Sequence, residues 1–130
     1  MADMAIKKQR PKNLDLKSIR LPLPGIVSII HRISGVGIFL LLPVLLWLLQ
    51  SSLSSPETFA VLKGVFGNPL AKIVLFGLIY LYMHHFCAGI RYLLLDLHKG
   101  IDLESARFSS KIVFVVSIAL SLIVGAKILW

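Results

Sequence analysis

The sequence has little charge for a water-facing surface and almost no cysteine. Only 15% of its 130 residues are charged, whereas 57%, about 74 side chains, are apolar. Soluble domains average roughly 25% charged and 45–50% apolar residues, and a chain this short leaves much of its surface in water. The shortage of charge therefore excludes an ordinary soluble globule. The single cysteine, Cys87, excludes an internal disulfide.

Long runs without charge predict where the chain crosses a membrane. Residues 33–56 and 112–126 contain no charged residue, and residues 73–90 contain only two histidines among otherwise uncharged side chains. One span takes about 20 apolar residues, so the apolar residues suffice for three helices but not for four with loops. Barrel strands would alternate apolar and polar residues, and these runs do not. We therefore predict an all-α membrane protein with three transmembrane helices.

The predicted division of the chain follows from these runs and from its prolines and glycines. Residues 1–24 form a cytoplasmic, interfacial amphipathic segment, and residues 25–130 form a three-helix membrane anchor with helices at about 25–50, 69–97 and 109–130. No cleavable signal peptide is expected, because the apolar run that follows the basic start is too long for a signal sequence.

The positive charges are unevenly distributed, and they predict the orientation. The connection 51–69 holds only Lys63, whereas the connection 97–111 holds Lys99, Arg107 and Lys111. Six basic residues precede the first span: Lys7, Lys8, Arg10, Lys12, Lys17 and Arg20. By the positive-inside rule, the N-terminus is cytoplasmic and the C-terminus periplasmic. Topology and anionic headgroups account for the basic arm, so we expect membrane lipid and no nucleic acid as its partner.

Ionisable groups inside a span are functional candidates because they are costly there. The first candidate cluster is Ser28, His31 and Arg32, whose spacings of three and four place them on one helix face that Gly35 continues. It lies at the predicted cytoplasmic start of the first span. An arginine and a hydroxyl there suit the recognition of anionic or carbonyl oxygen groups.

The second candidate cluster, His84, His85, Arg91 and Asp96, lies on the second span. His85, Gly89, Tyr92 and Asp96 fall within about 60° of one another on a helix. The imidazole of His85 can ligate a haem iron, and the missing side chain of Gly89, one turn away, lets a flat macrocycle approach the backbone. These residue types in this order indicate a haem site.

Structural explanations compete with these functional ones. His85 can simply form a helix-to-helix hydrogen bond, and the adjacent His84 points about 100° away, which favours a structural role. Arg32 and Arg91 can occupy cytoplasmic interfaces without binding anything. Ser28 can cap a helix or bond back to its own backbone.

The estimated depths of the two candidate histidines predict that they do not share one iron. Counted along their helices, His31 lies about 9 Å and His85 about 17 Å from the cytoplasmic face. Axial ligands of one haem need similar depth, so we expect one ligand from this chain and the other from a partner chain. His31 and Arg32 would then meet the haem propionates.

Most of the chain resembles a known family. The segments PKNLDLKSIRLPLPGIVSIIHRISG (11–35), SSLSSPE (51–57) and HFCAGIRYLLLD (85–96) carry the resemblance. Two ordered patterns, S-x-x-H-R-x-S-G and H-x-x-x-G-I-R, are its most specific part. The sequence is similar to the cytochrome b membrane-anchor subunits of bacterial succinate dehydrogenase, respiratory complex II, and to the larger of the two anchors.

The resemblance implies a role for each candidate residue. It makes His85 one axial ligand of haem b, with the other histidine coming from the smaller anchor, so that this chain forms half of a two-chain haem-binding bundle. Ser28 and Arg32 would line the ubiquinone site, His31 and Arg32 would lie near the haem propionates, and the haem would pack on Gly89. Tyr92 departs from the pattern, because close relatives often carry histidine there.

The resemblance also implies partners and a compartment. A flavoprotein subunit would hold FAD, an iron–sulfur subunit would hold the clusters, and the assembly would reside in the bacterial inner membrane. This chain would be a non-flavin subunit of an enzyme, without a complete active site of its own. Two alternatives stay open: the anchor of a quinol:fumarate reductase, and a haemless three-span scaffold or transporter subunit.

Overall fold

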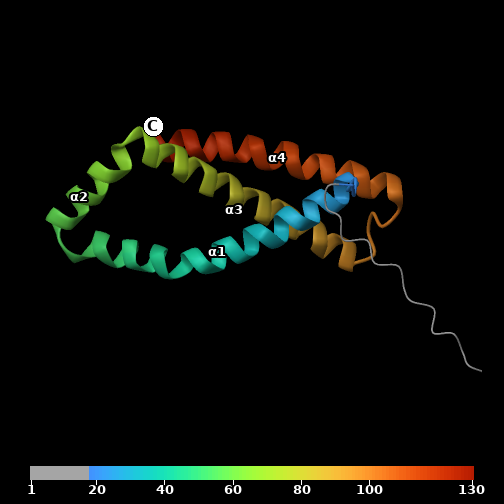
Figure 1. The fold of residues 1–130 in the computed structure, drawn as a ribbon, viewed down its shortest axis with the longest axis horizontal. Helices are drawn as coiled ribbons and strands as arrows, with labels where there is room; N and C mark the ends of the chain where they lie inside the picture. Colours follow the sequence, from blue (N-terminus) through green and yellow to red (C-terminus); the bar gives the residue numbers. More distant parts are fainter. Residues whose placement is uncertain (1–17) are drawn as a thin grey trace, which may run out of the picture.

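The computed structural model describes residues 18–130, which form four α-helices (Figure 1). In chain order they are α1 (Leu23–Ser54), α2 (Pro56–Gly67), α3 (Pro69–Asp96) and α4 (Leu103–Leu129). Within residues 18–130 there is no strand. Residues 1–17, most of the predicted amphipathic segment 1–24, lie outside the described part of the chain.

Helices α1, α3 and α4 are long and apolar enough to cross a membrane, with 32, 28 and 27 residues. At 1.5 Å per residue, even the shortest extends about 40 Å, more than the roughly 30 Å of a bilayer's hydrocarbon core. The predicted all-α architecture with three transmembrane helices is confirmed. The orientation of the two termini across the membrane stays a prediction.

Helix α2 lies in the connection that the sequence alone predicted to be a break between spans. Ser55 has an extended backbone, which ends α1, and its side chain then starts α2. Its Oγ accepts the N–H of Thr58 at 3.2 Å, while Thr58 Oγ1 accepts the N–H of Ser55 at 3.2 Å. This reciprocal capping box, followed by Pro56 at the first helical position, is a strong helix start.

Helix α4 begins at Leu103, six residues before the start expected at about 109. The Oδ1 atom of Asp102 accepts the N–H of Ser105 at 2.8 Å and caps the first turn. Before it, the chain turns through His98 and Gly100, whose φ angles are 57° and 70°. Glycine adopts such a left-handed backbone without strain, so Gly100 suits the turn that follows the second span.

Helices α3 and α4 approach closely through small residues on α4. A Cβ added to Gly125 would lie 2.8 Å from Cδ2 of Phe76, so this position has no room for a side chain. The small buried residues of α4 are Ser110, Ser117, Ser121 and Gly125. The three serine hydroxyls donate to carbonyls of their own helix, which satisfies them in an apolar interior.

Helix α1 contacts α3 near its own N-terminal end and diverges from it toward α2 (Figure 1). Leu41, Leu45 and Leu78 are among the apolar residues that line a cavity of about 380 Å³ between the diverging halves. The closest α1–α3 contact is therefore near the beginning of α1, the region that holds the polar candidate residues.

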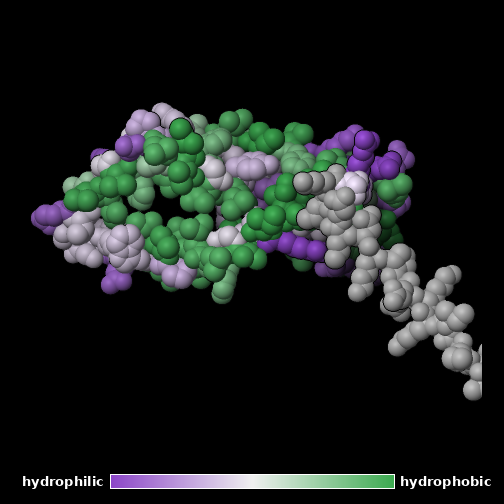
Figure 2. Space-filling view, in the orientation of Figure 1, coloured by the Kyte–Doolittle hydropathy of each residue, from purple (hydrophilic) through white to green (hydrophobic). Residues whose placement is uncertain are grey.

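The outer surface is apolar over the middle of the molecule and polar at the end where α4 begins (Figure 2). Among the 32 residues of α1, Val27 and Ser34 are the buried ones. So large an exposed apolar surface is unstable in water and must be covered by lipid or by another protein chain.

Candidate cofactor site

The first two spans meet at a pair of histidines. The imidazole rings of His31 on α1 and His85 on α3 stack with their centroids 4.2 Å apart and their planes 9° apart. The ring of Tyr92 is tilted against His31 at a centroid distance of 5.0 Å. His31 therefore contacts two rings on the α3 face that the sequence predicted to carry His85 and Tyr92 together.

Helix α1 also holds one nitrogen of His85. The Nδ1 atom lies 3.1 Å from the backbone carbonyl oxygen of His31 and 3.0 Å from Oγ of Ser34. Because a carbonyl oxygen can only accept, the bond to His31 requires that neutral His85 carries its proton on Nδ1. The lone pair that can bind a metal is then on Nε2. Metal-ligating histidines commonly have this arrangement, so His85 fits an iron ligand through Nε2.

Two glycines shape the space around the histidines. A Cβ on Gly35 would lie 3.0 Å from Cε1 of His85, a distance too short for an unstrained contact. Gly35 therefore permits the close approach of His85 to α1. A Cβ on Gly89 would lie 3.7 Å from Nε2 of His31, an ordinary contact. The space beside Gly89, where the sequence predicted a macrocycle, thus borders the edge of His31.

In the described part of the chain, His85 is a candidate ligand that no cage of further metal ligands surrounds. Within residues 18–130, no group of three or more histidine, cysteine or acidic side chains could hold a metal ion. Haem iron takes its equatorial ligands from the macrocycle and needs the protein only for axial ones. The donor set around His85 therefore suits haem and does not suit a bare metal ion held by this chain.

The predicted difference in depth between His31 and His85 is wrong, because their rings lie face to face. The estimate counted residues from the start of α1 and from the end of α3. It assumed that these two ends are level and that the helix axes are aligned, whereas α1 crosses α3 at an angle (Figure 1). The two rings still do not suit opposite sides of one iron. Each lone pair lies in its ring plane, and nearly parallel, face-to-face rings do not aim their lone pairs at each other.

Ser28 and Arg32 flank His31 on α1. Ser28 is half-buried and Arg32 is exposed. Their spacing of four residues places them on the same side of the helix. Neither is a hydrogen-bond partner of His85 Nδ1, whose partners in the described chain are His31 and Ser34. Because Arg32 is exposed, a ligand or another subunit can reach it.

His84 lies in the interior, away from the stacked pair. It is fully buried, with its ring 5.2 Å from that of Phe114 and 6.0 Å from that of Tyr80. Neither of its ring nitrogens has a hydrogen-bond partner in the described part of the chain. This position beside α4 agrees with the structural role that its helical direction favoured.

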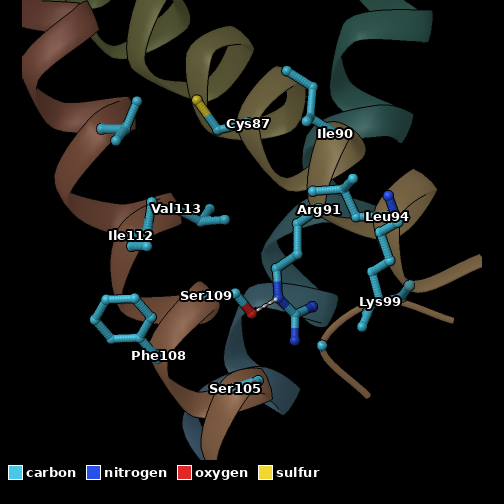
Figure 3. A pocket seen from close by; sticks show the side chains of 13 residues that line it. Cys87, Ile90, Arg91, Leu94, Lys99, Ser105, Phe108, Ser109, Ile112 and Val113 are labelled. Carbon is cyan, nitrogen blue, oxygen red and sulfur yellow. Dashed lines mark hydrogen bonds between the residues drawn. The ribbon is translucent and has the colours of Figure 1, made fainter. Parts of the chain in front are cut away.

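Arg91 joins α3 to α4, and the sequence alone left its role open. Its side chain is 6% exposed; Nε donates to Oγ of Ser109 at 2.9 Å, and Nη2 donates to the carbonyl of Ala106 at 3.3 Å (Figure 3). Both partners are uncharged. Beside it lies a cavity of about 460 Å³ between the two helices, lined mainly by apolar side chains such as Phe108 and Ile112.

Ser34 is the member of this site that the sequence analysis did not single out. It is fully buried, and its Oγ also donates to the carbonyl of His31 at 2.8 Å. The sequence feature that could have identified Ser34 is its position three residues after His31, which places both residues on one face of α1. What the sequence could not supply was the neighbouring helix that brings His85 to the same hydroxyl.

The fold and these residues define a helical membrane subunit whose first two spans meet at a histidine pair. Residues 6–124 match the family of succinate dehydrogenase/fumarate reductase transmembrane subunits. The chain belongs to this family, and this confirms the resemblance read from its motifs.

Individual relatives are similar over nearly their whole length. The chain is 36% identical to the succinate dehydrogenase cytochrome b556 subunit of Coxiella burnetii, over 92% of this chain and 97% of that protein. It is 32% identical to the subunit of that name from Paracoccus denitrificans, over 95% and 94% of the two chains. The corresponding subunit of Rickettsia felis is 29% identical over 91% and 92%.

Proposed function

We propose that this chain is the larger membrane anchor of a bacterial succinate:ubiquinone oxidoreductase, and that it binds haem b and part of the quinone site. Its similarity to proteins named cytochrome b556 subunits of succinate dehydrogenase supports this function. A smaller anchor, an iron–sulfur subunit and a flavoprotein subunit with FAD complete the enzyme in the inner membrane. The N-terminus and the α3–α4 connection face the cytoplasm.

The observation that carries the haem assignment is the hydrogen bonding of His85. Its Nδ1 donates to the carbonyl of His31 at 3.1 Å, which leaves Nε2 to bind iron. The second axial histidine comes from the smaller anchor, since His31 stacks on His85 instead of opposing it. Bound haem supplies a one-electron carrier between the succinate-oxidising subunits and the membrane.

Other residues of this chain hold the haem from the side. Gly89 carries no side chain on the face of His85, and the position of its missing Cβ lies 3.7 Å from Nε2 of His31. A flat macrocycle would pack at the edge of this contact. His31 borders this space, and the exposed Arg32 follows it on α1. A guanidinium forms strong charge-assisted hydrogen bonds with carboxylates. We therefore place the haem propionates near His31 and Arg32.

Ser28 and Arg32 contribute this chain's part of the ubiquinone site. The hydroxyl of Ser28 donates a hydrogen bond to a quinone oxygen. The guanidinium of Arg32 stabilises the negative charge that develops on that oxygen as the quinone is reduced, and the low dielectric of a membrane site strengthens this attraction. Proton donors and the remaining quinone contacts come from partner subunits, because this chain alone holds no complete active site.

A quinol:fumarate reductase anchor is the second candidate, because the family includes transmembrane subunits of both enzymes. The names of the relatives favour succinate dehydrogenase. The direction of turnover depends on the quinone potential as well as on the protein. Comparing succinate:ubiquinone and quinol:fumarate rates in the purified complex distinguishes the two.

A reduced-minus-oxidised spectrum of the purified complex tests the haem assignment. His85→Ala is expected to abolish a b-type band, because the iron loses an axial ligand. His84→Leu is the control: it removes the neighbouring histidine, whose ring nitrogens have no hydrogen-bond partner within residues 18–130, and it should keep the band. A band unchanged in His85→Ala would overturn the ligand assignment, and a wild-type complex without haem would favour the haemless scaffold.

A further inference from the structure

Three atoms form a closed hydrogen-bonded triangle between α1 and α3. Oγ of Ser34 lies 2.8 Å from the carbonyl oxygen of His31 and 3.0 Å from Nδ1 of His85, and this Nδ1 lies 3.1 Å from the same carbonyl oxygen. Ser34 is fully buried. The triangle is the polar contact that fixes the His85 ring against the first span.

Only one distribution of the protons makes all three contacts of the triangle hydrogen bonds. The carbonyl oxygen of His31 accepts only, so it receives the hydroxyl proton of Ser34 and shares the Nδ1 proton of His85. The hydroxyl that donates its proton presents its lone pairs to Nδ1–H. A hydroxyl that donates one hydrogen bond becomes a better acceptor for another. Because Ser34 donates to the carbonyl of His31, it accepts a stronger hydrogen bond from Nδ1–H of His85.

We infer that Ser34 is the positioning residue of the haem ligand His85. This inference rests on the proposed function, in which Nε2 of His85 binds the haem iron. The hydroxyl holds the imidazole plane and keeps the proton on Nδ1, and by accepting from Nδ1–H it makes Nε2 a stronger electron donor to iron. A stronger donor favours the ferric state, so Ser34 lowers the midpoint potential of the haem.

The serines of α4 show what an ordinary membrane-helix serine does in this chain. Ser117 is fully buried, like Ser34, and donates to a carbonyl three residues earlier, that of Phe114, at 3.1 Å. Ser121 donates to Ser117 O at 2.6 Å. Both hydroxyls bond within their own helix. Ser34 adds a partner 51 residues away, on another span, and this second contact gives it a role beyond satisfying its own hydroxyl.

The test compares Ser34→Ala with Ser117→Ala in the assembled complex. Each variant removes one fully buried hydroxyl that bonds to a carbonyl three residues earlier, but of the two only Ser34 is also hydrogen-bonded to a histidine. Ser34→Ala should raise the haem midpoint potential and weaken haem retention roughly ten-fold, the lower end of what losing such a supporting partner does. It should also change the electron paramagnetic resonance g values of the ferric haem, which depend on the orientation of the axial imidazole. Ser117→Ala should change none of the three.

Ser34→Cys is the second variant, in case the alanine variant does not assemble. A thiol is close in size to a hydroxyl and is a weaker hydrogen-bonding group, so its potential should shift in the same direction by less. If His85→Ala loses its haem but the Ser34 variants have the same midpoint potential and g values as Ser117→Ala, the inference about Ser34 is overturned. Haem retained in His85→Ala would instead overturn the proposed function, whatever Ser34 does.

Discussion

The imidazole of His31 stacks on that of His85 at 4.2 Å, yet it is the His31 backbone carbonyl, not the ring, that hydrogen-bonds His85. The ring and the carbonyl of one residue therefore have separable effects. Substituting the side chain removes the stack and the contact with Tyr92, but it leaves the acceptor for Nδ1 in place. The same residue supports its neighbour through its backbone and borders the Gly89 space through its side chain.

His31→Ala is expected to keep the b-type band, because the carbonyl that orients His85 remains and the His31 ring is not an iron ligand. The lost stacking should lower haem retention by much less than His85→Ala does. Reduced-minus-oxidised spectra of the two variant complexes, normalised to flavin, make the comparison. Loss of haem as complete as in His85→Ala would make the His31 ring a ligand.

Gly35→Ala is expected to displace the His85 ring. The added Cβ would lie 3.0 Å from Cε1, the atom next to the hydrogen-bonded Nδ1, so the ring cannot move away without lengthening its bonds to α1. We expect altered g values of the ferric haem and a partial loss of haem.

Gly37→Ala is the control for this substitution. It makes the same change in the same helix, but its Cβ would lie 3.4 Å from Cδ2 of Leu81, the end of a flexible side chain. Both variants gain about 1 kcal/mol of helix propensity, so propensity does not separate them. Identical spectra and haem contents in the two variants would contradict the close approach of His85 to Gly35.

The spans could be predicted from sequence because lipid burial leaves a compositional trace. Of the uncharged residues 33–56, all up to Ser54 lie in α1. This agreement needs no knowledge of what the helix packs against. One helix and one boundary were missed for a local reason. The caps at Ser55 and Asp102 start α2 and the first turn of α4 outside the long uncharged runs, and only those runs were used to predict helices.

The sequence could predict which site residues share a helix face, but it could not predict which residues of α1 and α3 contact each other. The pattern placed His85 and Gly89 together on one face of the second span, and His31 contacts that face. The relative tilt of α1 and α3 decides which turns meet, and no residue spacing within one helix encodes it. The estimated depths of His31 and His85 failed for this reason, and the part played by Ser34 stayed hidden for the same one.

Arg32→Leu is expected to lower succinate:ubiquinone reductase activity by about a hundred-fold, the lower end of the range for removing one donor that stabilises developing negative charge. Succinate oxidation with a water-soluble dye should be unchanged, because that reaction bypasses the membrane site. Arg107→Leu is the control, since it removes another exposed arginine, on α4 rather than beside His31. Equal quinone rates in the two variants would exclude Arg32 from the quinone site.

The cap of α4 is expected to weaken in acid. Hydrogen bonds from the Ser105 side chain and backbone hold the pKa of Asp102 below its ordinary value of 3.8. A carboxyl whose pKa is lowered by folding stabilises the fold above its ordinary pKa, and this stabilisation is lost as the pH falls from there through the lowered pKa. Hydrogen exchange of the Ser105 amide, corrected for intrinsic rates, should therefore accelerate below about pH 3.8. Asp102→Asn keeps an acceptor that does not titrate and should remove this pH dependence; an equal dependence in both would assign it to another group.

Ser109→Ala is expected to destabilise the complex more than Arg91→Met, although the arginine is much the larger side chain. Arg91 is 6% exposed, and its partners, Ser109 Oγ and the Ala106 carbonyl, carry no charge to offset its desolvation. Removing the serine leaves a buried cation short of one acceptor, a loss of about 1.5–3 kcal/mol. Replacing the arginine with methionine removes the buried charge together with its hydrogen bonds, and such replacements are often neutral.

Thermal denaturation of the purified complex measures the difference. The melting temperature of Ser109→Ala should be lower than that of Arg91→Met. The double variant should melt close to Arg91→Met, because the serine then has no cation to satisfy. The reverse ranking would mean that Arg91 has an anionic partner in the assembled enzyme.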